Sequence, residues 1–243
     1  MSKENVRVAV RFRPIDDQRT KRINVDSKIN MVKIDNEKLF FDYVFDESLN
    51  QSLRNNDSQS NQWNNDSISN QWDNDSKSNQ EEIFNKTSKQ AIEHVIEGYN
   101  TTIFSYGATG CGKTYTMFGD ENNKGIIPRS CNYLFQLLEN KNYNVNCSFL
   151  EIYCESVYDL FSSYQDISNS VKIRQHPSRG VYIQGLIERK INNLKDIIDN
   201  INDGVKRRHT ASTLLNNVSS RSHSIFIITV IQEMDDIKII SKL

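Results

Sequence analysis

The chain has 243 residues, of which 37% are hydrophobic and 25% charged, and its formal net charge is −1 at pH 7. This length predicts a single domain with one substantial core. The near-zero charge argues against nucleic acid or an anionic membrane as the main partner. No apolar run approaches the roughly 20 residues that span a bilayer, and the four cysteines show no zinc-ligand spacing. Together these features predict a soluble cytoplasmic protein with reduced thiols.

Short strands are expected at the start of the chain. Residues 6–12 alternate apolar and basic side chains, as a half-buried strand does, and Pro14 ends this strand. Arg11, Arg13 and Pro14 lie together at its exit, where arginines are usually the solvated face of a strand. Further strand candidates follow at residues 30–34 and 39–45. These runs predict the start of a twisted sheet.

Residues 48–80 interrupt this pattern with a repeat rich in Asn, Ser and Asp. A unit that starts at Asn56 recurs with a period of nine residues. The units are too short and too poor in apolar residues to bury a face, so they predict a disordered insertion in a surface loop. Lengthening a flexible loop costs only ~0.6 kcal/mol per doubling, so the fold tolerates it. Trp63 and Trp72 are either docking points for a partner or solvated residues copied with the repeat.

A helix and a strand are expected next. Residues 81–98 carry apolar side chains at helical spacing, with Glu81 and Glu82 in the first turn and Gly98 at the stop. Residues 101–106 are β-branched and aromatic, which predicts a short buried strand.

The most informative stretch is a complete G-x-x-x-x-G-K-T motif. Its residues are Gly107, Ala108, Thr109, Gly110, Cys111, Gly112, Lys113 and Thr114. Glycines let the backbone wrap closely around a polyphosphate, and the N–H groups at the start of a helix make the loop an anion pocket. Lys113 would bridge the terminal phosphates and the Thr114 hydroxyl would bind the accompanying Mg²⁺. Unless the stretch is an ordinary glycine turn, it predicts a nucleoside triphosphate site.

The second half of the chain alternates strands and helices. The expected strands are 146–153, 171–175, 181–185 and 224–232. One helix is expected after Gly125, and Asn193 caps another, which has Asp196 at its third position. Strands that alternate with helices around a glycine-rich loop indicate a mainly parallel α/β sheet.

A polar loop at residues 216–223 precedes the last strand. Small hydroxyl and amide side chains surround one arginine, Arg221. Such a loop is either a serine-rich turn or a sensor of the γ-phosphate, in which hydroxyls reach magnesium and water and the arginine binds a carboxylate when the loop closes.

Two of these motifs together resemble the motor domain of kinesins: G-x-x-x-x-G-K-T-Y-T-M at 107–117 and N-x-x-S-S-R-S-H at 216–223. Weaker matches occur in the same order along the chain. They are R-x-R-P at 11–14, G-Y-N at 98–100, E-I-Y at 151–153 and Y-D-L at 158–160. The resemblance covers nearly the whole chain except residues 48–80. It implies that residues 1–243 are a partial kinesin motor domain.

The resemblance implies an α/β P-loop NTPase fold of the kinesin motor type, with a central, mainly parallel sheet and helices on both faces. The implied nucleotide-binding residues are Arg11, Arg13, Pro14, Gly107, Ala108, Thr109, Gly110, Cys111, Gly112, Lys113, Thr114 and Tyr115. Among them, Arg11, Arg13 and Pro14 would frame the adenine. The implied catalytic residues are Asn216, Ser219, Ser220 and Arg221. Asn216 and Ser219 would help to place the attacking water and the γ-phosphate, Arg221 would form half of a gating salt bridge, and Thr114 and Ser220 would serve Mg²⁺.

Some positions depart from the family pattern or leave their role open. Most kinesins have glutamine where Ala108 stands, which hints at a subgroup. His176 and Arg179 match a region of the microtubule face and are equally compatible with a solvated turn. The chain stops before the family's D-L-A-G-S-E segment and contains no D-x-x-G, so we expect it to be inactive and poorly stable alone. The final Ser241-Lys242-Leu243 could be a peroxisomal address, but its register within the kinesin strand explains it better.

The function implied by the resemblance is that of an ATP-dependent microtubule motor, an ATPase that uses ATP and Mg²⁺. Microtubules would be the partner, with no nucleic acid and no membrane, and the location would be the cytoplasm and its cytoskeleton. A homodimer through a stalk outside this sequence is a further expectation. The alternative is a truncated, non-catalytic protein that binds nucleotide or tubulin.

Overall fold

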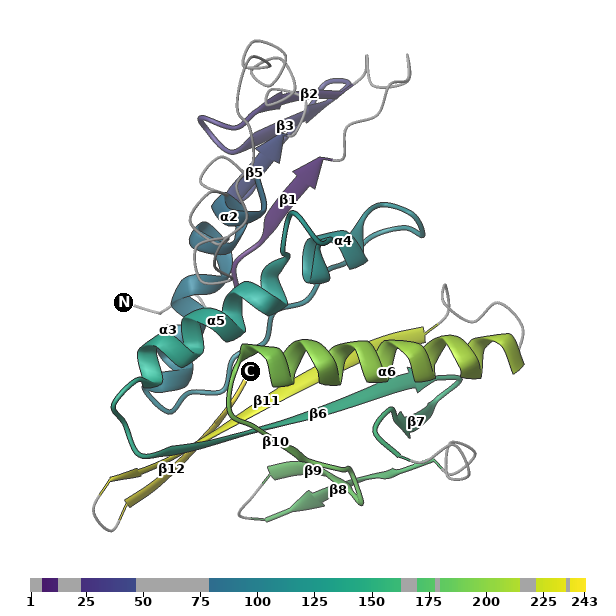
Figure 1. Cartoon of the computed structure of the whole chain (residues 1–243). Helices are drawn as coiled ribbons and strands as arrows, with labels where there is room; N and C mark the ends of the chain where they lie inside the picture. Colours follow the sequence, from purple (N-terminus) through teal and green to yellow (C-terminus); the bar gives the residue numbers. More distant parts are fainter. Residues whose placement is uncertain are drawn as a thin grey trace, which may run out of the picture. The chain divides into compact units, whose positions relative to one another are not determined.

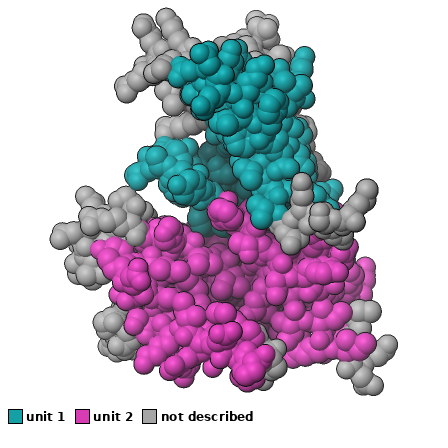
Figure 2. Space-filling model, turned by 180° about the vertical axis from the view of Figure 1, so that it is seen from behind, with its two compact units in different colours: residues 1–90, 105–129 teal, residues 91–104, 130–243 magenta. Residues whose placement is uncertain are grey.

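The computed structural model describes residues 6–12, 23–46, 79–162, 170–177, 180–214, 222–234 and 237–243. It contains two compact units (Figure 2). Unit 1 comprises Met1–Gln90 and Ser105–Arg129, and unit 2 comprises Ala91–Phe104 and Ser130–Leu243. Residues 48–78 of the expected insertion lie outside the described part. Asn79 and Gln80 do not belong to that insertion, because they begin a helix.

Unit 1 has short strands in two small sheets (Figure 1). The strands are β1 (Ala9–Phe12), β2 (Ile23–Asp26), β3 (Met31–Ile34), β4 (Glu37–Phe40) and β5 (Tyr43–Asp46). β2, β3 and β4 are antiparallel, whereas β1 and β5 pair in parallel. The strands predicted at 6–12 and 30–34 are confirmed over most of their length.

The single strand predicted at 39–45 is wrong, because the chain turns between β4 and β5. Asn30, in a left-handed conformation with φ 53°, ties this turn together. Its side-chain amide donates to Asp42 O at 2.8 Å and accepts the N–H of Val44 at 3.1 Å. The Asp42 carboxylate in turn accepts the N–H of Val8 at 2.7 Å. The apolar run therefore spans two strands that pair with different partners.

The predicted helix at 81–98 is confirmed, with a π-helical turn in its middle. Its parts are α2 (Asn79–Ile83), the π-helix η4 (Phe84–Ser88) and α3 (Lys89–Ile96). The Thr87 hydroxyl donates to Ile83 O at 2.6 Å, so a side chain adds a bond to a carbonyl of the preceding turn. Ile83, Phe84 and Ile92 are buried.

Unit 2 is built on one sheet with the strand order β10-β6-β11-β12, in which β7 also pairs with β6. The strands are β6 (Tyr143–Tyr153), β7 (Ser156–Asp159), β10 (Arg189–Ile191), β11 (Ser222–Met234) and β12 (Ile237–Lys242). A separate hairpin consists of β8 (Lys172–His176) and β9 (Gly180–Gln184). The helices are α5 (Ile126–Leu138), which begins in unit 1, and α6 (Leu194–Leu214). The strands and helices predicted here are all found, with shifted ends.

The strand directions differ from the expected mainly parallel sheet. Every described strand pair of unit 2 is antiparallel, and β1 with β5 is the parallel pair of unit 1. A tight turn accounts for one of these pairs. Cys154 and Glu155, both at positive φ, join β6 to β7 by the two-residue turn that suits the twist of a hairpin.

Helix α6 packs on one face of this sheet (Figure 1). Its start is capped as predicted, since Asn193 Oδ1 accepts the N–H of Asp196 at 2.9 Å. Phe149 of β6 lies in the core at 1% exposure and makes edge-to-face contacts with Phe161 and Phe226. A Cβ at Gly204 of α6 would overlap the Phe149 ring. The glycine therefore sets how closely helix and sheet approach.

Gly204→Ala is expected to lower the free energy of unfolding by up to about 2 kcal/mol. Alanine improves helix propensity by about 1 kcal/mol, but forcing a methyl group into the Phe149 ring costs about 1–3 kcal/mol. Urea denaturation measures the difference, and Asn202→Ala, at an exposed position of the same helix, is the control. In a Phe149→Leu background, Gly204→Ala should lower the free energy of unfolding by less. If the effects of the two substitutions simply add, the methyl group does not act by overlapping the Phe149 ring.

The buried strand predicted at 101–106 is wrong. These residues form no strand, and Phe104 and Tyr106 are 76% and 95% exposed. The Thr101 N–H donates to Lys242 O at 2.9 Å, but no described strand pairs with the residues that follow. β-branched and aromatic residues favour a strand only where a neighbour completes its hydrogen bonds, and local sequence cannot supply that neighbour.

The end of the chain lies within the sheet. Ser241 is fully buried, and its hydroxyl donates to Val95 O at 2.7 Å. Leu243 exchanges two backbone hydrogen bonds with Ile228, both at 2.9 Å. Residues 237–242 therefore form an edge strand of this sheet, next to β11. None of the described helices is long and apolar enough to cross a bilayer.

An ion-pair network fastens α6 to the rest of unit 2. Asp203 accepts hydrogen bonds from Arg189 Nη1 at 2.7 Å and from Arg207 Nε at 3.1 Å. The Arg189 guanidinium also stacks on Phe161, 4.1 Å from the ring centroid. Burial alone would raise the pKa of Asp203, but the bonds from the two arginines outweigh it and lower that pKa below its usual value.

Asp203→Asn is expected to lower the free energy of unfolding more near neutral pH than at acidic pH. Because the folded-state pKa of Asp203 is lower than the unfolded one, the ionised carboxylate stabilises the fold above the unfolded pKa of about 3.9. That contribution is lost as the pH falls through the folded-state pKa. The difference in urea midpoint between the original and the variant should therefore shrink below about pH 4. If this difference in urea midpoint does not change with pH, or if the exposed control Asp199→Asn gives the same difference, Asp203 does not stabilise the fold through its ionised carboxylate.

Candidate functional site

The glycine-rich stretch 107–114 forms a loop that leads into α4 (Lys113–Phe118). Gly110 and Gly112 have φ values of 81° and 101°, in the left-handed region that side chains rarely adopt. At Gly107 a Cβ would stand 2.6 Å from the Cys111 sulfur. The glycines therefore allow the backbone to close on itself here, as the sequence predicted.

Lys113 lies over this loop. Its Nζ donates to Gly107 O and to Ala108 O, both at 2.8 Å. The ammonium group is thereby held against the loop, where it can meet an anion bound by the loop N–H groups. Thr114 follows at an exposed position, so its hydroxyl is accessible to a ligand of the same loop.

The described residues hold no ready-made metal site. Nowhere in the described ranges do three His, Cys, Asp or Glu side chains gather as metal ligands. Mg²⁺ in phosphate sites commonly takes one or two protein oxygens and completes its shell with phosphate and water. The exposed Thr114 hydroxyl fits that mode of binding.

A second cluster of unit 1 joins β1, α2 and α4. Arg11 Nη1 donates to Gln80 Oε1 at 3.0 Å and to Thr116 Oγ1 at 2.8 Å. Gln80 Nε2 donates to Tyr115 O at 2.7 Å. The Arg11 guanidinium lies 5.0 Å from the centroid of the Tyr115 ring, within cation–π range. Two of the predicted nucleotide-binding residues, Arg11 and Tyr115, are therefore neighbours.

Gln80 is the member of this cluster that the sequence did not reveal. The repeat includes it by pattern, because Asn79 and Gln80 copy the Asn-Gln pair of the two earlier units. In those units a tryptophan follows the pair, whereas here Glu81 follows and an amphipathic helix begins. The missing tryptophan was the available signal that the repeat had already ended.

Several predicted site residues lie outside the described part of the chain. They are Arg13, Pro14, Arg179, Asn216, Ser219, Ser220 and Arg221. Their roles remain predictions. The two elements that flank the polar loop are described: α6 ends at Leu214 and β11 begins at Ser222.

Arg208 of α6 connects these flanking elements to the core of the sheet. Its Nε donates to Glu151 Oε1 at 2.9 Å and its Nη2 donates to Ser222 Oγ at 2.9 Å. Glu151, of the E-I-Y stretch, is only 5% exposed. One guanidinium therefore ties the end of the helix, the middle strand and the first residue of β11 together.

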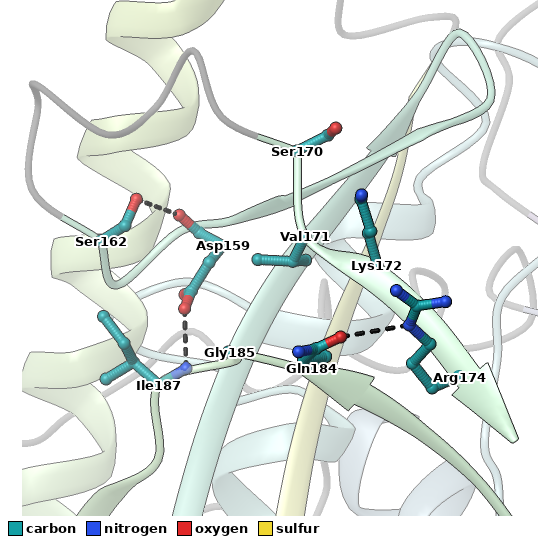
Figure 3. A pocket seen from close by; sticks show the side chains of 9 residues that line it. All are labelled: Asp159, Ser162, Ser170, Val171, Lys172, Arg174, Gln184, Gly185 and Ile187. Atoms are coloured by element: carbon teal, nitrogen blue, oxygen red, sulfur yellow. Dashed lines mark hydrogen bonds between the residues drawn. The ribbon is translucent and has the colours of Figure 1, made fainter.

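A hollow of about 580 Å³ lies beside the β8–β9 hairpin of unit 2 (Figure 3). It is lined by Asp159, Ser162, Ser170, Val171, Lys172, Arg174, Gln184, Gly185 and Ile187. Both carboxylate oxygens of Asp159 are occupied, since they accept the N–H groups of Phe161 and Ile187 at 2.8 and 2.7 Å. Arg174 Nε donates to Gln184 Oε1 at 3.1 Å. Asp159 and Arg174 thus hold the hairpin and its connections in place.

Buried thiols play no chemical part in these sites. Burial raises the pKa of Cys147 to about 12, more than the nearby Arg189 lowers it. Burial likewise raises the pKa of Cys131. Both thiols stay protonated at neutral pH and act as small apolar groups.

The glycine-rich loop leads directly into a helix, and its lysine binds the carbonyls of the loop. These features define the class of the protein as a P-loop NTPase. Comparison with known families narrows this class. The family model of the kinesin motor domain matches residues 11–243. The chain therefore belongs to the kinesin motor domain family.

Individual relatives agree with this assignment. The chain is 40% identical over 158 residues to the kinesin-like protein unc-104 of Caenorhabditis elegans. The aligned region covers 62% of this chain and 10% of that protein. It is 39% identical over 160 residues to the kinesin-like protein KIF1B of Rattus norvegicus, covering 63% of this chain and 9% of that protein. The chain thus spans about a tenth of the length of these relatives.

A solved structure of a fast kinesin shares the fold, with a TM-score of 0.77 and 27% sequence identity. The match covers 98% of this chain and 64% of that one. That structure was described for its implications for the ATPase mechanism of the fast kinesin and for its interactions with microtubules. The α/β P-loop NTPase fold of the kinesin motor type, predicted from two motifs, is confirmed.

Proposed function

We propose that this chain is the nucleotide-binding part of an ATP-dependent microtubule motor, and that the complete protein is an ATPase. The proposal rests on the position of Lys113, whose Nζ donates hydrogen bonds at 2.8 Å to two carbonyl oxygens of the glycine-rich loop. Kinesin family membership supplies the context. ATP with Mg²⁺ is the proposed ligand, with the triphosphate in the loop and the base near Arg11 and Tyr115.

The proposed roles follow the family motifs. Residues 107–114 bind the phosphates, Arg11, Arg13, Pro14 and Tyr115 lie at the base, and Thr114 and Ser220 serve Mg²⁺. Asn216 and Ser219 help to place the attacking water and the γ-phosphate, and Arg221 gates the step. Hydrolysis transfers the γ-phosphoryl group to water and leaves ADP and phosphate.

The β8–β9 hairpin supports the proposal that microtubules are the partner. Lys172, Arg174 and His176 lie exposed on β8, and no Asp or Glu occurs between residues 172 and 184. A basic, acid-free hairpin suits an acidic protein surface such as that of tubulin. A cytoskeletal location and dimerisation through segments beyond this sequence belong to the same proposal.

Titration of the purified 243-residue chain with a fluorescent ATP analogue, with and without Mg²⁺, tests the proposal. Saturable binding that requires Mg²⁺ supports it, and no binding at any accessible concentration would refute the nucleotide site. Co-sedimentation with microtubules in the presence and absence of nucleotide tests the partner. Microtubule-stimulated ATP turnover by the chain would exclude the non-catalytic alternative.

A further inference from the structure

Gln80 is an unusually buried polar residue for its position near the start of a helix. Gln80 is only 1% exposed, although it follows directly on a polar repeat. A buried amide that lacks partners costs free energy, so its hydrogen bonds show what holds it there. Gln80 has one partner on β1 and one on α4.

The two partners need a side chain that both accepts and donates a hydrogen bond. Arg11 can only donate and the Tyr115 carbonyl can only accept, so the group between them must accept on one side and donate on the other. Gln80 does both, at 3.0 Å to Arg11 and 2.7 Å to Tyr115 O. This pairing also fixes which end of the amide is oxygen. Glutamate would lose the donor, and methionine would lose both bonds while keeping the length of the side chain.

Gln80 thereby holds two groups that face each other. The Arg11 guanidinium, also bonded to Thr116 Oγ1 at 2.8 Å, lies 5.0 Å from the centroid of the Tyr115 ring. One amide fixes the guanidinium and the backbone of the residue that carries the ring. Fixing both before a ligand arrives lowers the ordering cost of binding, which is otherwise substantial for a long arginine side chain.

We infer that Gln80 is a positioning residue for the base of the nucleotide, acting through Arg11 and Tyr115 and not through the phosphates. This inference rests on the proposed function, because it assigns the base to the Arg11 and Tyr115 side of the site. It separates the site into two parts with different ligands: the loop with Lys113 recognises a polyphosphate, and the cluster around Gln80 recognises the purine.

The test compares MgATP with magnesium tripolyphosphate, which carries the phosphates without a base. In Gln80→Met, MgATP should bind about 10-fold more weakly because Arg11 and the Tyr115 backbone are no longer held in place, whereas tripolyphosphate affinity should change by less than about twofold. Gln90→Met, at an exposed position of the same helical segment, is the matched control and should change neither. An equal loss for both ligands, or no loss, would overturn the inference.

A double-mutant cycle with Arg11→Met checks the route of action. If Gln80 works mainly through Arg11, Gln80→Met should cost less than about threefold in MgATP affinity once Arg11 is absent. An undiminished 10-fold loss in that background would reject the route. Should Gln80→Met not fold, Gln80→Glu keeps the acceptor for Arg11, and a loss shared equally by tripolyphosphate would again reject the inference. Failure of the unsubstituted chain to bind MgATP would reject the proposed function and this inference together.

Discussion

Lys113→Ala is expected to weaken MgATP binding by about 100-fold or more. A hydrogen bond to a charged group contributes about 1.5–3 kcal/mol, and under the proposed function Lys113 would make two such bonds to phosphate oxygens. In the unliganded chain, Nζ bonds to Gly107 O and Ala108 O instead. These carbonyls belong to exposed residues, so water replaces the lysine there when it is removed. The titration with the fluorescent ATP analogue measures the loss directly.

The same reasoning predicts that Lys113→Ala leaves the fold intact. Its free energy of unfolding should stay within about 0.5 kcal/mol of the original, as for other surface substitutions. Lys141→Ala, which removes an exposed lysine outside the loop, should keep full affinity. Retained MgATP binding by Lys113→Ala would refute the assignment of the loop, and a large loss of stability would mean that the binding defect has another cause.

Local sequence was sufficient where local chemistry decides the structure. The glycines of residues 107–114 are needed for left-handed backbone, Asn193 caps its own helix, and the apolar spacing of 81–98 marks one buried face. Each of these features depends on residues that are neighbours along the chain. The phosphate loop could therefore be recognised together with the start of α4.

Pairing between distant segments could not be predicted in this way. Residues 101–106 have the composition of a strand and yet form none, because a strand also needs a hydrogen-bonded neighbour. The antiparallel β6–β7 hairpin depends on the Cys154-Glu155 turn, which contains no glycine and gives no turn signal, and the β6–β11 pair joins strands far apart in the sequence. Gln80 was hidden by a repeat whose Asn-Gln pair it copies.

The Glu151–Arg208 contact shows the same limit at the level of side chains. The two residues are 57 positions apart, and neither one alone indicates a buried ion pair. The resemblance singled out the E-I-Y stretch without explaining its glutamate. The structure supplies the reason: Glu151 is 5% exposed and meets the one guanidinium that also reaches Ser222.

Arg208→Met is therefore expected to lower the free energy of unfolding by about 2–3 kcal/mol. Breaking a buried pair leaves an uncompensated charge, which costs about 3–5 kcal/mol when both groups are fully buried. The Arg208 side chain is 24% exposed and that of Glu151 is 7% exposed, so water reduces this cost. Urea denaturation measures the change, and Lys195→Met, at an exposed position of α6, is the control.

The partner substitution separates charge from packing. Adding Glu151→Gln to Arg208→Met removes the unpaired carboxylate and should restore at least half of the lost stability. No restoration would mean that Arg208 acts mainly through the packing of its stem and through Ser222. Arg208 of α6 also bonds to Ser222, the first residue of β11, so a restored double variant would show that charge compensation at Glu151 accounts for most of what this contact contributes to stability.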